Sequence, residues 1–214
     1  MDLFTNDEAL DRYLVEHSHE EDPVLKELAR HTYLNEVHPR MLSGHILGSF
    51  LTLFSKLISP QRILEIGTYT GYSAICLARG LRPGGTLTTI EVNDELCSTA
   101  LKYFRKADLQ ELIQLINGDA LDVLPALQDT YDLVFVDANK DDYPKYFELV
   151  IDKLRSGGYI LVDNVLWGGK VLEKSPRDHT TRIMDQFNKT IAADHRVENL
   201  LLPIRDGIMV IKKR

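Results

Sequence analysis

The stretch that decides the fold is RILEIGTYTG, residues 62–71. The apolar run 62–66 predicts a short strand, and Gly67 ends it. A helix fits residues 72–81, and the turn Arg82-Pro83-Gly84-Gly85 follows it. A strand, a glycine-containing turn and a helix in this order form the first part of a βαβ unit.

The same alternation continues along the chain. Further strands are predicted at 86–92, 113–116, 131–137 and 159–163, with helices at 94–106 and 146–154. Such alternation favours a mostly parallel sheet with right-handed crossovers and helices on both faces. Two last strands, 197–202 and 207–211, have no helix between them and could pair as an antiparallel hairpin. The prediction is an α/β fold with a seven-stranded, mostly parallel sheet.

The N-terminal segment has the pattern of helices. Thr5 and Glu8 fit a capping box, Pro23 suits the first turn of a second helix, and residues 41–58 carry a helical apolar stripe. We find no repeat and no linker. We therefore expect one domain over residues 1–214, with N-terminal helices in 1–58 and a Rossmann-like core in 61–214.

Composition is that of an ordinary globular protein: of 214 residues, 44% are hydrophobic and 27% charged. The formal net charge of −7 makes nucleic acid an unlikely default partner. Cys76 and Cys97 lie in no metal-type cluster, and reduced, packed thiols are expected. The acidic N-terminus does not fit a signal peptide, and we see no stretch near the ~18 apolar residues of a spanning helix. These features predict a cytoplasmic protein with no membrane partner.

Ligands of such sheets bind beyond the carboxyl ends of the strands. The glycine turn there is not a dinucleotide fingerprint, because Tyr69 stands where the second glycine is needed. A Walker A loop is also absent. The form E-x-G-x-x-x-G, with Glu65, Gly67 and Gly71, suits a nucleoside without phosphates, although a turn without a ligand would look similar.

Two polar residues follow the next strands. Glu91 lies at the distance from the glycine turn at which a carboxylate can accept both ribose hydroxyls. Asp119 could reach an adenine amino group. The alternatives are a solvated carboxylate for Glu91 and a helix cap for Asp119.

Asp137 and the pair Asp163-Asn164 end two further strands. Two carboxylates and an amide suit Mg²⁺, with Ca²⁺ or Mn²⁺ also possible, and the lack of His or Cys disfavours zinc. Lys140, three residues after Asp137, could take a proton from an activated hydroxyl. The alternatives are turn and cap residues for the metal set, and a surface lysine for Lys140.

Four stretches together resemble the cation-dependent O-methyltransferases, the family of the caffeoyl-CoA and catechol O-methyltransferases. They are LEIGTYTGYS (64–73), IE (90–91), VDANKDDY (136–143) and VDNVLW (162–167). The resemblance runs from about Met41 to the C-terminus and is closest to the caffeoyl-CoA branch and its bacterial relatives. It implies a Rossmann-like, class I methyltransferase fold that uses S-adenosylmethionine and a divalent cation.

The resemblance also implies a role for each matched residue. The cofactor would be bound by Glu65, Gly67, Tyr69, Gly71, Ser73, Glu91, Asp119, Ala120 and Asp137. The metal would be held by Asp137, Asp163 and Asn164, and Lys140 looks like the family's proposed base. The acceptor would contact Met41, Lys140 and Trp167.

The implied reaction is O-methylation of a vicinal diol on a small aromatic molecule, by a protein that is commonly a homodimer in this family. A glutamate that contacts the acceptor in mammalian catechol enzymes is replaced here by Leu200, six residues before Asp206-Gly207. Methylation of a hydroxylated uridine in tRNA is a second hypothesis, with Arg177, Arg182 and Lys189 as candidate RNA contacts. A non-catalytic nucleoside-binding module is a third.

Overall fold

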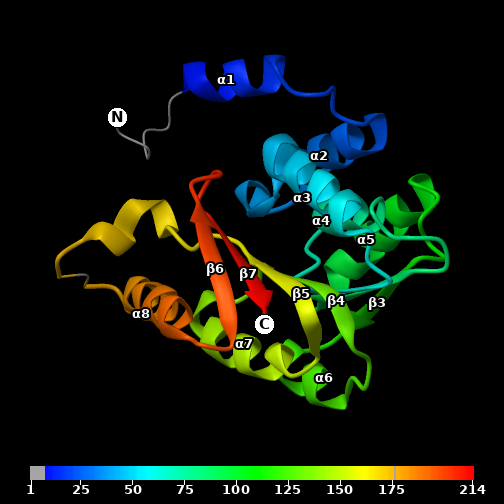
Figure 1. Ribbon diagram of the computed structural model, residues 1–214. Coiled ribbons are helices and arrows are strands. Elements are labelled where there is room, and N and C mark those ends of the chain that lie inside the picture. Colours follow the sequence, from blue (N-terminus) through cyan, green and yellow to red (C-terminus); the bar gives the residue numbers. More distant parts are fainter. Residues whose placement is uncertain (1–7, 176) are drawn as a thin grey trace.

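In the computed structural model, which describes residues 8–175 and 177–214, a seven-stranded sheet forms the centre of the protein (Figure 1). The strands follow the order β3-β2-β1-β4-β5-β7-β6, and β7 runs antiparallel to both of its neighbours. The mostly parallel sheet with a C-terminal hairpin is therefore confirmed. The strands are β1 (Arg62–Ile66), β2 (Thr86–Glu91), β3 (Ile113–Asn117), β4 (Tyr131–Val136), β5 (Leu154–Val162), β6 (Val197–Leu202) and β7 (Ile208–Lys213).

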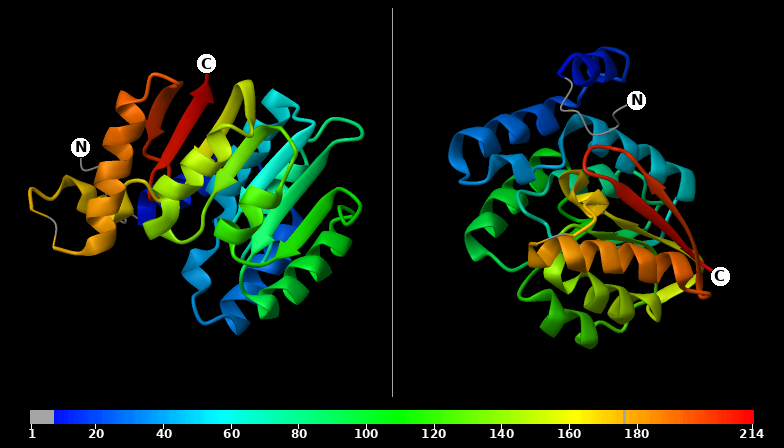
Figure 2. Two further views of the ribbon diagram at one scale, coloured as in Figure 1. Left: turned by 90° about the horizontal axis from the view of Figure 1, so that it is seen from below. Right: turned by 90° about the vertical axis from the view of Figure 1, so that its left-hand side faces the viewer.

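Helices cover both faces of the sheet, as the right panel of Figure 2 shows. One face carries α2 (Pro23–Asn35), α3 (Gly44–Ile58), α4 (Tyr72–Ala78) and α5 (Asp94–Lys106). The other carries α6 (Ala120–Ala126), α7 (Tyr143–Ile151) and α8 (His179–Ala193). Neighbouring residues of β1 serve opposite faces, since Ile63 packs with the first group and Leu64 with the second. Parallel strands that are apolar on both sides are thus buried on both sides.

Several boundaries differ from the predicted ones. Helix α4 ends at Ala78, three residues early, and α7 covers 143–151 instead of 146–154. Strand β5 begins at Leu154, because Leu154 pairs with Tyr131 and the strand then continues through Gly157 and Gly158. Gly157 and Gly158 have the local pattern of a turn but lie inside this strand, at a shift in register.

The N-terminal helices follow the predicted pattern with one change. Helix α1 covers Glu8–Glu16, and its predicted cap at Thr5 lies outside the described residues. Pro23 is the first residue of α2, and the Asp22 carboxylate caps it by accepting from the Val24 amide at 2.8 Å. The helix predicted over 41–58 begins at Gly44 and is preceded by a 3₁₀ turn, η1 (Pro39–Met41).

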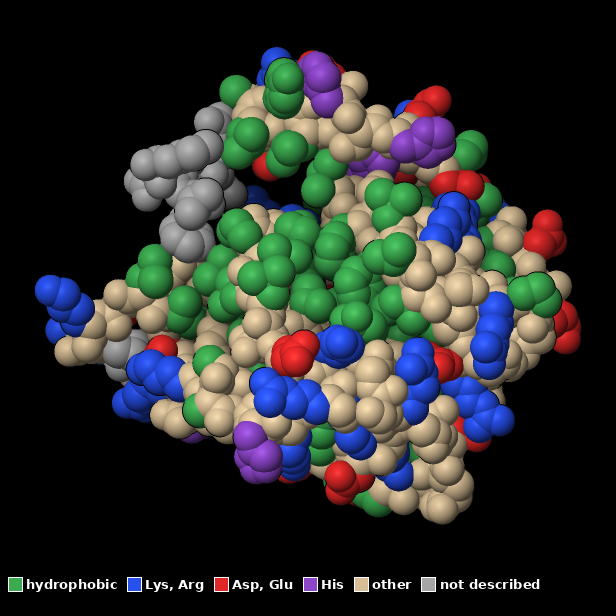
Figure 3. Space-filling model, in the orientation of Figure 1, with side chains coloured by type: hydrophobic (Ala, Val, Ile, Leu, Met, Phe, Trp, Pro, Cys, Tyr) green, Lys and Arg blue, Asp and Glu red, His purple; other side chains and the backbone are tan. Residues whose placement is uncertain are grey.

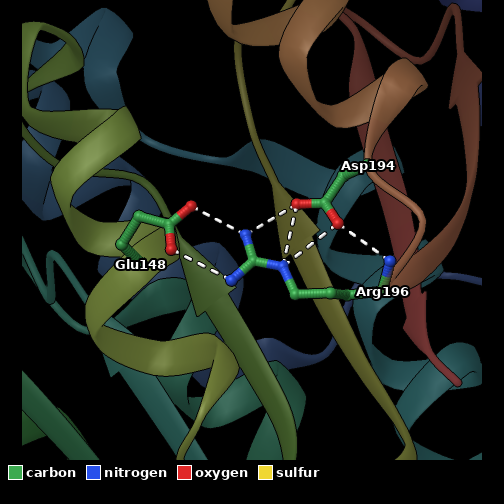
Figure 4. A network of polar contacts seen from close by, with 3 residues as sticks. All are labelled: Glu148, Asp194 and Arg196. Atoms are coloured by element: carbon green, nitrogen blue, oxygen red, sulfur yellow. Dashed lines mark hydrogen bonds and ion pairs between the residues drawn. The ribbon is translucent and has the colours of Figure 1, made fainter.

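The C-terminal hairpin is tied to the helical layer by Arg196 (Figure 4). Its guanidinium donates to Glu148 of α7 at 2.8 Å and to Asp194, at the end of α8, at 2.6 Å. It also lies 5.4 Å from the centre of the Phe147 ring. The turn between α8 and β6 is therefore held against α7 by several bonds from one side chain.

One apolar segment contradicts our reading of the sequence. Residues Pro39–Ile58 form a helical stretch of 20 residues with mean hydropathy 1.4, which is long and apolar enough to span a membrane. Core helices of globular proteins meet the same criterion. Here α3 packs against α4, and its Leu47 and Leu51 are fully buried.

Candidate functional site

The carboxyl ends of β1, β4 and β5 lie side by side. The Asp137 amide donates to the Ile66 carbonyl at 2.9 Å, and the Asp163 amide donates to the Val136 carbonyl at 3.0 Å. Gly67, Asp137 and Asp163 therefore leave the sheet at one edge. This edge includes the switch point between β1 and β4, where the chain connections diverge and ligands bind in sheets of this kind.

A cavity of about 590 Å³ opens at this edge beside β1 and β2. Six of the nine predicted cofactor-binding residues line it, namely Gly67, Tyr69, Glu91, Asp119, Ala120 and Asp137. Its size is within the range of small-molecule sites. Asp119 also caps α6, accepting from the Leu121 amide at 2.8 Å, so the alternative prediction of a helix cap is confirmed.

Glu91 is fixed at the wall of this cavity by two backbone amides. One carboxylate oxygen accepts from the Tyr69 amide at 2.7 Å, and the other accepts from the Asn93 amide at 2.9 Å. The first bond requires Tyr69 to adopt a left-handed backbone, with φ of 51°. The glycine turn and the end of β2 are thus joined through one carboxylate, which is 7% exposed.

Glu65, Gly71 and Ser73 do not reach the cavity wall. Glu65 is fully buried, and Thr89 donates to its carboxylate at 2.5 Å. Burial raises the pKa of Glu65 to about 8, although hydrogen bonds from Thr89 and Ser73 oppose the rise. Gly71 precedes α4 with φ of 94°, and a side chain there would come within 2.7 Å of Phe104. These three residues therefore stabilise the glycine turn, residues 67–71, without lining the cavity.

A second cavity, of about 730 Å³, adjoins the first. The predicted acceptor residues Met41, Lys140 and Trp167 line it, together with the predicted metal ligands Asp137, Asp163 and Asn164. Asp137, Met41 and the backbone around Ala138 line both cavities. A group bound in one cavity and a group bound in the other would therefore meet at Asp137.

At this junction one lysine, Lys140, lies near two carboxylates, Asp137 and Asp163. Lys140 donates to Asp137 at 2.7 Å, and both side chains are largely buried. Burial, helped by the nearby Asp137 carboxylate, raises the pKa of Asp163 to about 7. Among residues 8–175 and 177–214, no three His, Cys, Asp or Glu side chains converge on a possible metal position. The candidate set here is two carboxylates and the amide of Asn164.

The comparisons with known proteins agree with this geometry. The sequence model of the O-methyltransferase family matches residues 15–214. Caffeoyl-CoA O-methyltransferase 2 of Eucalyptus globulus is 36% identical, with 96% of this chain and 89% of that protein covered. The chain belongs to the O-methyltransferase family.

Solved structures that align with this chain contain S-adenosylmethionine or its product. The methyltransferase PaMTH1 of Podospora anserina, bound to S-adenosylhomocysteine, aligns with TM-score 0.88 and 31% identity over 98% of this chain and 97% of that chain. The O-methyltransferase TomG of Streptomyces achromogenes, in complex with S-adenosylmethionine, aligns with TM-score 0.87 and 32% identity over 96% of each. The protein is an S-adenosylmethionine-dependent O-methyltransferase of the caffeoyl-CoA type, as the sequence predicted.

Two residues of this O-methyltransferase site were missed by sequence reasoning. Arg205, in the turn between β6 and β7, lines the larger cavity and donates to the backbone carbonyls of Leu42, at 2.8 Å, and Ser43. Its neighbour Asp206 accepts from the Gly168 amide and stands close to Asn164. These partners are far apart in sequence, so no local pattern marks them.

Backbone strain gathers around the two cavities of the O-methyltransferase. Six non-glycine residues of the described chain have positive φ, and four of them line a cavity: Tyr69, Asn164, Trp167 and Arg205. Residues other than glycine rarely adopt this backbone conformation unless contacts with the surrounding structure stabilise it. The two other cases, Ser59 and Asp108, follow helices α3 and α5, where such residues commonly end a helix.

Proposed function

We propose that this enzyme transfers the methyl group of S-adenosylmethionine to one hydroxyl of a vicinal diol on a small aromatic acceptor, with the help of a divalent cation. The observation that carries the proposal is the position of Asp137, Asp163 and Asn164. All three line the larger cavity, and Asp137 also lines the smaller one. Donor and acceptor would therefore meet beside the candidate metal ligands.

The chemistry of the donor set supports a hard divalent cation. Two carboxylates and an amide are oxygen ligands of the kind that Mg²⁺ and Ca²⁺ take. Burial, and after it the nearby Asp137 carboxylate, raises the pKa of Asp163, and a bound cation would stabilise the charged form of both carboxylates. When bound, the ion would lower the pKa of a coordinated hydroxyl and favour a diol, because two adjacent oxygens can share one ion.

The smaller cavity is proposed to hold the cofactor. Glu91 would accept from the ribose hydroxyls, because its carboxylate faces the cavity and is held in place by the Tyr69 and Asn93 amides. Asp119 and Ala120 would lie near the adenine. Gly67 would pass close to the methionine part, while Glu65 and Ser73 would act through the turn they support.

Lys140 is proposed to accept the proton that leaves the acceptor oxygen. The carbon–sulfur bond of the donor breaks as the new carbon–oxygen bond forms, so the oxygen must lose its proton. In the structure Lys140 donates to Asp137 at 2.7 Å. Its amine therefore lies at the junction of the two cavities. If Asp137 turned to a cation, the freed ammonium would first lose a proton to water, and the neutral amine could then accept the proton of the acceptor oxygen.

A homodimer is proposed for the whole domain, residues 1–214. Hydrophobic side chains gather over the middle of one face, below α1 (Figure 3). The exposed apolar residues include Leu10, Tyr13 and Leu14 of α1 and Leu53 and Leu57 of α3. A second copy of the chain would remove this apolar surface from water.

One assay with labelled S-adenosylmethionine tests the function. We expect methyl transfer to catechols or caffeoyl esters that EDTA abolishes and Mg²⁺ restores. Lys140→Ala should lower kcat by about 100-fold or more while the cofactor Kd changes little. Transfer that is indifferent to EDTA would remove the cation, and transfer to bulk tRNA alone would favour the RNA hypothesis.

A further inference from the structure

Two arginines that line the larger cavity form no ion pair with a carboxylate of the described residues. Arg205 and Arg40 both line it, together with His38 and Lys140. Lys140 is paired with Asp137. Neither arginine makes an ion pair with a carboxylate of the described residues, and Arg40 has no hydrogen-bond partner there either. In a protein with formal net charge −7, unpaired cations at one cavity point to a ligand.

Arg205 is held rigidly. Its Nη1 donates to the backbone carbonyls of Leu42 and Ser43, which lead into α3. Its backbone has φ of 50°, a conformation that side chains rarely adopt. Nε and Nη2 find no acceptor in the described part of the chain. A guanidinium fixed through one nitrogen, with donors left over, is prepared to bind a planar anion.

The carboxylates around the cavity already have other partners. Asp141 accepts from Thr180 at 2.8 Å, and Asp163 accepts from the Asn164 amide at 2.7 Å. Burial raises the pKa of Asp163 and of Asp206, and the charge of Arg205 opposes part of each rise without forming an ion pair with either carboxylate. The two arginines therefore remain available to a bound molecule.

The geometry points to an acceptor that carries a carboxylate on its aromatic frame in addition to the diol, with the carboxylate bound by Arg205 and Arg40 at the wall of the larger cavity. This inference rests on the proposed function and names its substrate class. Met41, Pro39 and Trp167 supply apolar lining of the same cavity, against which an aromatic ring can pack. A carboxylate matches the fork of an arginine better than a single hydroxyl or ester oxygen does.

Three acceptors with the same diol distinguish a carboxylate site from a phosphate site. Caffeate carries a carboxylate, its CoA thioester carries phosphates, and its methyl ester carries neither. We expect kcat/KM for caffeate to exceed that for the methyl ester by about 10- to 100-fold, the range of a charged hydrogen bond. In Arg205→Met, the ratio of the two values should fall toward one. Arg205→Lys should give an intermediate ratio, because it keeps the charge and loses the fork.

The matched control is Arg62→Met. Arg62 begins β1, at the end of the strand away from the cavities, and its ion pair is with Asp129. Its acid-to-ester ratio should equal that of the wild type. Thermal unfolding of each variant shows whether the fold has been kept, and Arg205→Lys provides the second reading if Arg205→Met does not fold.

Binding is measured separately from turnover. Trp167 is the one tryptophan of the chain and lines the larger cavity, so its fluorescence reports occupancy. If no diol is methylated, the proposed function fails, yet tighter binding of caffeate than of its ester, lost in Arg205→Met, would still support the carboxylate site. Equal binding of acid and ester by the wild type would overturn it. A preference for the CoA thioester that depends on Arg205 would also overturn it, in favour of a phosphate site.

Discussion

The pKa of Glu65 is determined by burial inside the protein. The Glu65 side chain is fully buried behind the cofactor cavity, and its pKa is raised by burial to about 8 from a usual value of 4.5. One of its carboxylate oxygens has no hydrogen-bond partner among the described residues. Between about pH 4.5 and pH 8, the folded protein therefore holds a proton on Glu65 that the unfolded chain has released.

We predict that Glu65→Gln changes the pH dependence of stability. The folded wild type binds a proton that the unfolded chain does not between about pH 4.5 and pH 8, so its free energy of unfolding should fall as pH rises through that window. The slope from this group is at most about 1.4 kcal/mol per pH unit. Glutamine carries no titrating group, so its curve should be flatter. Urea unfolding without cofactor at about pH 5 and about pH 8 measures the difference, and parallel curves would contradict the raised pKa.

At the scale of the elements, Gly67 sets how closely β1 and β4 approach. Its φ is 98°, and a Cβ at this position would overlap the backbone carbonyl of Asp137. Neither atom can move without shifting the strand ends that carry both cavities. The glycine is required by the close approach of two backbones as well as by its own conformation.

We predict a large effect for Gly67→Ala and a small one for Gly84→Ala. Both positions have positive φ, but a Cβ at Gly84 meets nothing within 4 Å. The control should lose about 1–2 kcal/mol from left-handed strain alone. Overlap with Asp137 should bring the loss in Gly67→Ala to about 3 kcal/mol or more, and weaken cofactor binding. Unfolding free energies and titration with S-adenosylhomocysteine measure both, and equal losses would show that the contact with Asp137 is unimportant.

The elements differ in how far the sequence could predict them. Strand β1 matches its predicted bounds because an apolar run and Gly67 mark both the strand and its end. Strand β5 begins five residues before its predicted start at Tyr159, because Gly157-Gly158 has the local pattern of a turn and only the pairing of Leu154 with Tyr131 extends the strand. Local patterns mark strand centres, whereas tertiary pairing sets their ends.

The candidate site divides in the same way. Asp137 and Asp163 could be predicted, since each directly follows an apolar strand and parallel strands bring such ends together. Arg205 could not, because its hydrogen bonds go to residues 162 and 163 positions away along the chain. No local sequence pattern around Arg205 predicts that contact.

At the scale of the whole molecule, the N-terminal helices leave an apolar surface uncovered. Helix α1 lies at the edge of the molecule in Figure 1 and contacts α3. On α3, Leu53 is 67% exposed and Leu57 is 82% exposed, while Leu47 and Leu51 of the same helix are fully buried. The helix therefore presents apolar side chains on both sides, and only one side is packed by the described residues.

We predict that the protein sediments at twice its chain mass of 24.4 kDa and that the double variant Leu53→Glu/Leu57→Glu shifts it to the mass of one chain. Two carboxylates buried without partners would oppose association strongly, whereas on an exposed surface they cost little. Leu101→Glu, at a 37% exposed position of α5, is the matched control and should keep the wild-type mass. Sedimentation velocity at several concentrations measures each species. Because both cavities are lined by residues of one chain, the separated subunit should still bind S-adenosylhomocysteine. A double variant that keeps the wild-type mass would assign the apolar face of α3 to another role.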